Sequence, residues 1–508
     1  MEQGITELSS LEPIPPSIAR LPYAFFQRNG IVPLGCRQDP AVLVVAVSKE
    51  ASMSKPDILG VYANLPIEKK VVSQEEFENQ LNIFREEQGR EVVIGVVEGL
   101  GQGNISEIAQ ELPNGHDLQD DAANEPPIIK LVNLLFSIAV QDRASDIHIQ
   151  PLENDVRVRF RIDGLLYDIY ILPKRTQNAV VSRIKVMAGL DVAEKRLPQD
   201  GRIKIRVSDR EIDVRVSIIP SVYGEQTVMR LLDKGATLIG LDEIGMAGLK
   251  QAMVSLISRP QGVFLVTGPT GSGKTTTLYA ALKFINTPEK NILTVEDPVE
   301  YILPGIAQMQ VSSKIHLDFA RALRSFLRQD PDVIMVGEIR DEETAEIAIQ
   351  AALTGHLVFS TLHTNDSASA LTRLIDMGIE PYLLTSSITA ILAQRLVRKI
   401  CPHCKDLYAV SEYEKDLLRA YIRDGEKPLY KGKGCDRCLN TGYMGRVGIF
   451  ELLILNTKIR QMVQQKASSE DIKAQAMKDG MASLRDDGLN KAFEGITTLS
   501  EVIRVTIE

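Results

Sequence analysis

Residues 268–275, with the sequence GPTGSGKT, are the segment of the chain whose chemistry is easiest to read. They match the pattern Gly-x-x-x-x-Gly-Lys-Ser/Thr, after an apolar run at 262–267 and before a helix-forming run. The glycines let successive backbone N–H groups turn toward one point, where the helix N-terminus adds its positive dipole end. The sequence therefore predicts a phosphate-binding loop, made by Gly268, Pro269, Thr270, Gly271, Ser272, Gly273, Lys274, Thr275 and Thr276.

Two side chains of this loop have predicted roles in nucleotide chemistry. The ammonium group of Lys274 would reach the β- and γ-phosphates, and the hydroxyl of Thr275 would bind Mg²⁺. The expected ligand is therefore ATP together with Mg²⁺.

Carboxylates follow a second apolar run, NILTVE at 291–296. Glu296, Asp297 and Glu300 would lie at the C-terminal edge of a parallel strand, where ligands bind in such sheets. Carboxylates there can orient a water molecule or bind a metal, and one of the three is expected to be structural.

A third apolar run, within DPDVIMVGEIRD at 330–341, ends in Gly337 and Glu338. Most phosphate-loop NTPases have an Asp at this strand end that helps to hold Mg²⁺. Gly337 permits close backbone approach, so Glu338 is the favoured catalytic acid. The sequence leaves open whether Glu296, Glu300 or Glu338 accepts the proton of the attacking water.

Histidines and arginines complete the candidate site. His356 and His363 stand on either side of a short apolar run and could sense or stabilise the γ-phosphate, although either alone is more simply a hydrogen-bonded structural group. In the predicted helix at 318–330, arginines cluster opposite an apolar stripe. For Arg324 and Arg328, a solvated basic face and a surface for nucleotide or a neighbouring subunit are equally open.

The elements that must position these residues indicate an α/β fold. From about residue 236, apolar strands alternate with helices, which predicts a parallel sheet. Upstream, residues 126–235 combine an amphipathic helix at 127–141 with strands at 155–164 and 202–217, joined within the last segment by a turn at 208–209. Apolar residues alternate there with arginines, as in half-buried strands with a basic face. This second domain is therefore α+β.

The first 125 residues divide into a domain and a linker. Residues 106–125 contain six acidic residues and no Lys or Arg, which is typical of a solvated linker. Residues 1–105 are then a separate N-terminal domain of mixed pattern, with strand-like runs at 41–48 and 91–99.

Composition narrows the class of protein. The chain has 508 residues, 44% of them hydrophobic and 25% charged, which is ordinary for a globular protein. A formal net charge of −9 argues against a protein built mainly to bind nucleic acid. The sequence shows neither a membrane-spanning run nor a signal peptide, so we expect a cytosolic protein whose membrane association comes through a partner.

Four of the five cysteines form two Cys-x-x-Cys pairs, Cys401/Cys404 and Cys435/Cys438. Disulfides are improbable in a reducing compartment, so the pairs favour a metal. Four thiolates suit tetrahedral Zn²⁺ and leave no open position, which indicates a structural zinc site. His403, inside the first pair, is an alternative ligand.

The order of these motifs resembles the secretion and traffic ATPases of bacterial type II secretion and type IV pili. The similar motifs are the phosphate loop, EDPVE, the strand ending in Gly-Glu, TGHLVFSTLHTND and the cysteine pairs, with ASDIHIQP, RLPQDGRI and GEQTVMRLLDK upstream. The resemblance covers the chain from about residue 126. It implies a hexameric RecA-like ATPase at 236–508, a PAS-like domain at 126–235 and a zinc-binding insert at about 398–445, which retraction-type pilus motors lack.

The resemblance also carries residue roles onto this sequence. Glu338 matches the family's catalytic glutamate, and Arg215 and Arg230 match positions where the upstream domain offers arginines to the nucleotide.

Residues 18–35 resemble the start of the type II secretion members, whose N-terminal domain docks onto the cytoplasmic part of an inner-membrane L-type protein. This implies a cytoplasmic ATPase, peripheral at the inner membrane, which works with a platform protein to assemble a pseudopilus and export proteins. A pilus-extension ATPase is the alternative. Two alternatives from other classes stay open. One is a DNA translocase or conjugation ATPase, and the other is a nucleotide-gated scaffold with negligible turnover.

Overall fold

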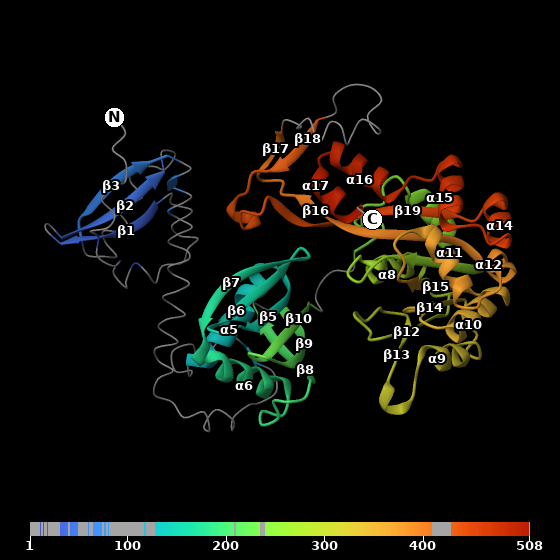
Figure 1. Ribbon diagram of the computed structural model, residues 1–508, viewed down its shortest axis with the longest axis horizontal. Helices are drawn as coiled ribbons and strands as arrows, with labels where there is room; N and C mark the ends of the chain where they lie inside the picture. The colour runs from blue at the N-terminus through green and yellow to red at the C-terminus, as the bar shows by residue number, and fades with distance from the viewer. Residues whose placement is uncertain are drawn as a thin grey trace. The chain divides into compact units, whose positions relative to one another are not determined.

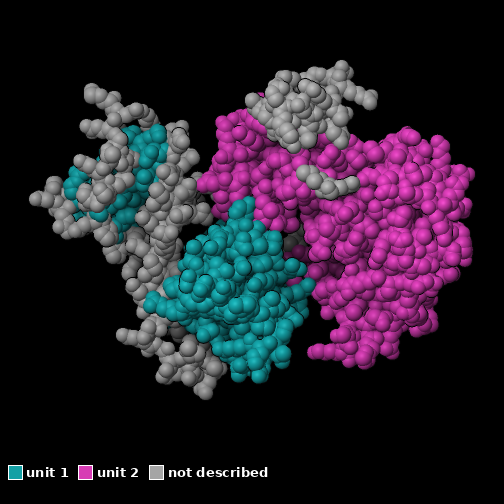
Figure 2. Space-filling view, in the orientation of Figure 1, with its two compact units in different colours: residues 1–162, 166–231 teal, residues 163–165, 232–508 magenta. Residues whose placement is uncertain are grey.

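The computed structural model describes residues 127–207, 210–233, 239–408 and 428–506 of the chain, with short stretches and single positions among the first 117 residues. The chain divides into two compact units, residues 1–162 with 166–231, and residues 163–165 with 232–508 (Figure 2). Among the residues described, no helix is both long enough and apolar enough to cross a bilayer.

Near the N-terminus the structure describes a three-stranded sheet, ordered β1-β2-β3 (Figure 1). Strands β1 (Ile31–Gln38) and β2 (Ala41–Ser48) are antiparallel, and β3 (Ile67–Val72) pairs parallel with β2. The predicted strand at 41–48 is therefore confirmed. The predicted strand at 91–99, and residues 19–30 of the segment at 18–35, lie outside the described residues.

The remainder of the first unit is built on a seven-stranded sheet with the order β4-β8-β9-β10-β5-β6-β7. Its strands are β4 (His116–Asp117), β5 (Ala144–Pro151), β6 (Asp155–Ile162), β7 (Leu165–Pro173), β8 (Gln199–Val207), β9 (Arg210–Ser221) and β10 (Gly224–Asp233). Helices α5 (Pro127–Gln141) and α6 (Gln177–Ala188) belong to the same unit, so the predicted helix at 127–141 is confirmed.

The alternating pattern in β6 gives this sheet one buried and one polar face. Val156, Val158 and Phe160 are buried, whereas the arginines between them reach carboxylates. Arg159 pairs with Asp168 at 2.7 Å. The predicted turn at 208–209 lies outside the described residues, and the predicted linker is described only at β4, which pairs with β8.

The second unit is built on another seven-stranded sheet, ordered β13-β12-β14-β15-β11-β16-β19. Only the pairing of β16 with β19 is antiparallel. The strands are β11 (Gly262–Thr267), β12 (Ile292–Glu296), β13 (Ala307–Gln310), β14 (Val333–Val336), β15 (Leu357–Leu362), β16 (Ile388–Ile400) and β19 (Tyr443–Ile454).

Helices cover both faces of this sheet, which is why its central strands β11, β12, β14 and β15 are buried along their whole length. One core packs β11, β12, β14 and β15 against α9 (Phe319–Phe326), α10 (Glu342–Leu353) and α11 (Ser367–Asp376). The other core packs the opposite face against α7 (Lys250–Ile257) and α8 (Lys274–Ile285). The predicted α/β class is therefore confirmed.

Asp side chains cap the helices that follow three of the strands. Asp318, Asp341 and Asp366 each accept a hydrogen bond from a backbone N–H in the first turn of α9, α10 and α11, respectively. Such caps satisfy N–H groups that a helix start leaves without partners. The predicted helix start at Asp341 is confirmed.

The C-terminal part adds a small hairpin and four helices. Strands β17 (Lys405–Tyr408) and β18 (Leu429–Gly432) pair between β16 and β19 in the sequence. The helices are α14 (Thr457–Gln464), α15 (Ser469–Lys478), α16 (Leu484–Phe493) and α17 (Leu499–Thr506), preceded in the chain by α12 (Pro381–Ser387) between α11 and β16.

Candidate nucleotide site and cysteine cluster

The carboxyl ends of β11, β12, β14 and β15 meet at one edge of the second sheet, since these strands are parallel neighbours. The phosphate loop follows β11, Glu296 ends β12, Glu338 follows β14 and His363 follows β15. Three of the predicted catalytic side chains therefore extend from the same edge as the predicted phosphate loop.

The loop at 268–273 has the backbone that a phosphate cradle needs. Gly268, Gly271 and Gly273 have φ values of 151°, 79° and 88°, in the region that favours glycine. No side chain caps the start of α8, so its first N–H groups are available to an anion. The hydroxyl of Ser272 is buried without a hydrogen-bond partner. These features fit the phosphates of a nucleotide.

Lys274 is folded back onto the loop. Its side chain is buried, and Nζ donates to the carbonyl oxygens of Gly268 at 2.8 Å and Pro269 at 3.2 Å. Burial lowers the pKa of Lys274 to about 8, while the negative charge of Glu338 raises it and the charge of Arg395 lowers it. Lys274 thus lies at the sheet edge that also carries Glu338, and it binds carbonyl groups that phosphates could replace.

Glu338 lies between Arg340 and His363. Its Oε1 accepts a hydrogen bond from Arg340, and its Oε2 lies 3.1 Å from Nε2 of His363. Burial opposes ionisation of Glu338, but the hydrogen bonds and charges of Arg340 and His363 outweigh it, so its pKa is below the ordinary value. Arg340 is not among the site residues predicted from the sequence. Its position two residues after Glu338, at the same strand end, could have indicated that it contacts this carboxylate.

Glu296 lies inside the protein, with a side chain that is only 3% exposed. Its Oε2 accepts a hydrogen bond from the Tyr279 hydroxyl, and its Oε1 accepts from Thr294 at 2.6 Å and Gln308 at 3.0 Å. Burial and this hydrogen bond raise the pKa of Tyr279. Because protein groups occupy both carboxylate oxygens, Glu296 here ties α8 to β12 and β13, and Asp297 next to it is exposed.

His356 does not lie with His363. It precedes β15, level with the start of β11, whereas His363 follows β15, level with the phosphate loop. Its Nδ1 lies 2.8 Å from the carbonyl oxygen of Ala351, at the end of α10. The expectation that both histidines lie near the phosphate site is therefore corrected for His356, because a parallel strand carries its two ends to opposite edges of the sheet.

The arginines of the 318–330 segment are engaged on α9 and just after it. Arg324 pairs with Glu343 of α10, and Nη1 of Arg328 donates to the carbonyl oxygen of Arg324 at 2.8 Å. Both side chains are solvent-facing, so these contacts leave both interpretations of the basic face open.

Arg215 and Arg230 belong to the first unit, on β9 and β10. Nε of Arg230 donates to Oδ1 of Asp146 at 2.9 Å, and Asp146 is itself buried and accepts from Ser145 at 2.7 Å. The guanidinium group of Arg230 is thus held from one side by a buried carboxylate, with its side chain 58% exposed.

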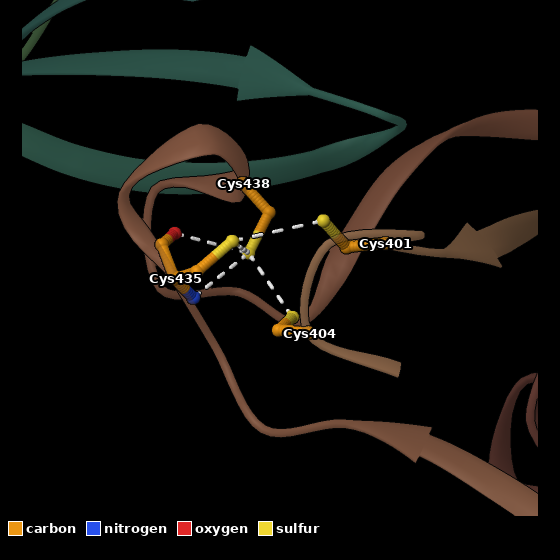
Figure 3. Close-up of side chains that lie close together, drawn as sticks. All are labelled: Cys401, Cys404, Cys435 and Cys438. Carbon is orange, nitrogen blue, oxygen red and sulfur yellow. Dashed lines mark hydrogen bonds between the residues drawn. The ribbon is translucent and has the colours of Figure 1, made fainter. Parts of the chain in front are cut away.

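The two Cys-x-x-Cys pairs meet in one cluster, with all four Sγ atoms within 4.8 Å of one another (Figure 3). Cys401 follows β16, Cys435 precedes the short 3₁₀ helix Asp436–Cys438, and Cys438 is the last residue of that helix. The Sγ–Sγ distances from Cys401 to Cys435, from Cys404 to Cys438 and from Cys435 to Cys438 are 3.8, 3.9 and 3.7 Å. Tetrahedral Zn²⁺ with Zn–S bonds of about 2.3 Å requires about 3.8 Å, so the four thiols fit that ion.

His403 lies outside this cluster. Both of its ring nitrogens face Nη1 of Arg437, at 3.3 and 3.1 Å. Backbone N–H groups of Cys435 and Gly442 point instead at Sγ of Cys438, at 3.2 and 3.3 Å. Such donors stabilise a thiolate, so the four cysteines make the complete candidate ligand set.

Comparison with known proteins decides the family. The family described as "Type II/IV secretion system protein" matches residues 121–504. The chain belongs to this family. Membership in the type II/IV secretion family confirms the predicted recognition and the predicted enzyme class, ATP hydrolase.

Relatives in this secretion family resemble the chain over nearly its whole length. The "Type II secretion system protein E" of Dickeya dadantii is 46% identical over 490 residues, covering 96% of this chain and 97% of that protein. The "Type II secretion system ATPase E" of Vibrio cholerae is 45% identical over 502 residues, covering 97% of each. The "Type IV pilus assembly ATPase PilB" of Myxococcus xanthus is 45% identical over 502 residues, covering 96% and 87%.

Two solved structures share the fold. The "Pilus Retraction Motor PilT and Bound ADP" has a TM-score of 0.51 and 28% identity, covering 74% of this chain and 97% of that one. The Legionella pneumophila ATPase DotB has a TM-score of 0.56 and 21% identity, covering 77% and 99%. The predicted fold, a RecA-like ATPase core with a preceding α+β domain, is therefore confirmed.

Proposed function

We propose that this chain is the ATPase that drives pseudopilus assembly and protein export in a bacterial type II secretion system. The observation that carries the enzymatic part is the strand order, which brings Glu338 after β14, His363 after β15 and the phosphate loop with Lys274 after β11 to one edge of the sheet. The similarity to proteins named for type II secretion supports the choice of system, since it covers 97% of each of the two secretion relatives above, compared with 87% of the pilus ATPase PilB.

In the proposed reaction, the backbone N–H groups of the loop and Lys274 bind the β- and γ-phosphates of ATP. The hydroxyl of Thr275 would hold Mg²⁺, which would neutralise charge on the phosphates. Glu338 orients the attacking water and accepts its proton, and His363 holds Glu338 from the neighbouring strand end. Glu296 supports this site through Tyr279 and the sheet rather than by contact with the water.

We further propose that Arg215 and Arg230 contribute charge to the nucleotide, in a homo-hexamer whose subunits complete one another's sites. The exposed guanidinium of Arg230, anchored by buried Asp146, supports this role. An arginine that stabilises the transferring phosphoryl group is worth about 10³-fold or more in rate. Arg→Ala at both positions that leaves the ATPase rate and oligomeric state unchanged would remove this part of the proposal.

The remaining assignments concern organisation and location. We propose a partner-docking domain at 1–105, a linker at 106–125, a PAS-like domain at 126–235 and the motor at 236–508. Cys401, Cys404, Cys435 and Cys438 would hold a structural Zn²⁺ in an insert at about 398–445. The protein would be cytoplasmic, peripheral at the inner membrane through the cytoplasmic domain of an L-type protein and a platform protein, and would need no nucleic acid.

One experiment tests both the activity and the system. The ATPase rate and oligomeric state of the full chain are measured with and without the cytoplasmic domain of the L-type secretion protein. We expect binding of that domain and a rise in rate that follows oligomer formation. Binding to a pilus platform instead would favour pilus extension, which the 45% identity to PilB keeps as the second candidate. DNA-stimulated hydrolysis with a steep salt dependence would contradict both.

A further inference from the structure

A glutamine on β16 faces the point where the phosphate loop leaves the sheet. β16 pairs parallel with β11, and the last paired residues are Thr267 and Ala393. Gln394 therefore stands level with Gly268, the first residue of the loop. It is 2% exposed, although a buried amide must be hydrogen-bonded to avoid a desolvation cost.

The side chain of Gln394 is bonded to the helix that follows the loop. Its Oε1 accepts a hydrogen bond of 2.7 Å from the hydroxyl of Thr277, which is 0% exposed. Thr277 lies in the first turn of α8, and its backbone N–H donates to Gly273 at the end of the loop. A single buried bond thus links the start of α8 to β16, across 117 residues of sequence.

Both outer glycines of the loop close against the same residue. A Cβ atom at Gly273 would lie 2.8 Å from Nε2 in the side chain of Gln394. A Cβ atom at Gly268 would lie 2.5 Å from the backbone carbonyl oxygen of Gln394. Distances this short exclude a side chain at either position without movement of the strand or the amide. The path of the loop is therefore fixed at its beginning and at its end by Gln394.

We propose that Gln394 is a positioning residue for nucleotide binding, which holds the phosphate loop in its binding shape through Thr277, Gly268 and Gly273. The amide is neutral, so it fills this place without adding negative charge next to the bound phosphates. The inference rests on the proposed binding of ATP at this loop. Gln394 thus increases the affinity for ATP without contacting the substrate.

The test measures the Kd of a fluorescent ATP analogue, with ATP competition, on the full chain. Gln394→Met keeps the size of the side chain and removes the acceptor, and Thr277→Val removes the donor. Each should weaken ATP binding about tenfold, since a buried group loses its partner and the loop loses its anchor. The double variant should bind no more weakly than either single variant, because both remove one bond. Thr277→Ser keeps the hydroxyl and should bind as the natural protein does.

A matched control lies on the same pair of strands. The hydroxyl of Thr389, also on β16, donates to the carbonyl oxygen of Val263 at 3.0 Å, at the far end of β11 from the loop. Thr389→Val also removes a buried hydrogen bond from a threonine hydroxyl, and it should lower the melting temperature without changing the Kd for ATP. Gln394→Met that binds ATP normally, or Thr389→Val that weakens binding equally, would overturn the role of Gln394. Absence of binding by the natural protein would instead refute the proposed function.

Discussion

Nε2 of His363 lies 3.1 Å from Oε2 of Glu338, across the ends of the neighbouring parallel strands β15 and β14. Two hydroxyls of β15 fix this geometry, since Ser360 and Thr361 donate to the carbonyl oxygens of Val336 and Gly337 at 2.8 and 2.7 Å. The carboxylate of Glu338, which stands where most phosphate-loop NTPases have an Asp, is thus held by the neighbouring strand β15. It lies at the sheet edge that also carries the phosphate loop.

Replacement of Glu338 by Gln should abolish hydrolysis and preserve binding. Removing a general base costs roughly 10²- to 10⁴-fold in rate, whereas an amide of the same size leaves the phosphate loop intact. A phosphate-release assay measures the rate, and the Kd for ATP should stay within about threefold because the loop still binds the phosphates. Equal rates for Glu338→Gln and the natural protein would support the nucleotide-gated scaffold instead.

Replacement by Ala should lower kcat at His363 and lower stability at His356. His363→Ala frees one oxygen of Glu338 and should lower kcat by about tenfold or more. His356→Ala removes the contact with the Ala351 carbonyl, so it should cost about 1 kcal/mol of unfolding free energy and leave kcat unchanged. Steady-state kinetics and denaturant unfolding on both variants separate these effects, and a large loss of kcat in His356→Ala would contradict the assignment.

Binding of ATP should weaken above pH 8 through Lys274. In the free protein its pKa is about 8, below the ordinary lysine value, so the positive charge that phosphates require is lost as the pH rises through 8. The Kd should then rise up to about tenfold per pH unit. Because the charge of Glu338 raises the pKa of Lys274, Glu338→Gln should move this break to lower pH. Affinity independent of pH from 7 to 10 would refute the prediction.

Zinc should be bound in a ratio of one ion per chain through the cysteine cluster. Cys438→Ser should remove the ion and lower the melting temperature, because the β17–β18 hairpin loses the link that joins it to β16 and β19. Cys36→Ser, far from the cluster in sequence, is the control and should keep the metal. Elemental analysis and thermal unfolding check both, and freshly purified protein without zinc would contradict the assignment.

Stability below pH 4.5 should depend on Glu501, a carboxylate 2% exposed that pairs with Arg398 and Arg504. Burial opposes its ionisation, but hydrogen bonds from both arginines outweigh it and hold its pKa at about 2. The resulting stabilisation, about 3 kcal/mol, is complete above the unfolded-state pKa near 4.5 and disappears as the pH falls toward 2.

Glu501→Gln should destabilise the protein at pH 7, since the largely buried guanidinium of Arg398 on β16 would lose the charged partner that Glu501 provides. The variant should also lose less stability between pH 5 and pH 3 than the natural protein. Urea unfolding across that range measures both effects. If the free energy of unfolding fell in parallel with pH for the two proteins, another carboxylate would govern the loss of stability in acid.

The sequence by itself determined the parts whose physics is local. The glycine pattern at 268–273, the helix start at Asp341, the mainly apolar strands and the paired cysteines depend on neighbours within a few residues. Turn chemistry, capping and hydrophobic period act over that range, so they can be read without knowing the strand order.

The tertiary structure decided which of these residues meet. The length of β15 separates His356 from His363, and the pairing of β15 with β14 brings His363 to Glu338, with Arg340 bonded to the other oxygen of that carboxylate. Burial of Glu296 depends on Tyr279 from α8 and Gln308 from β13, and the phosphate loop is anchored by Gln394 from β16. Such contacts join segments up to 117 residues apart. No local pattern specifies them, because they form only when the strands have taken their order in the sheet.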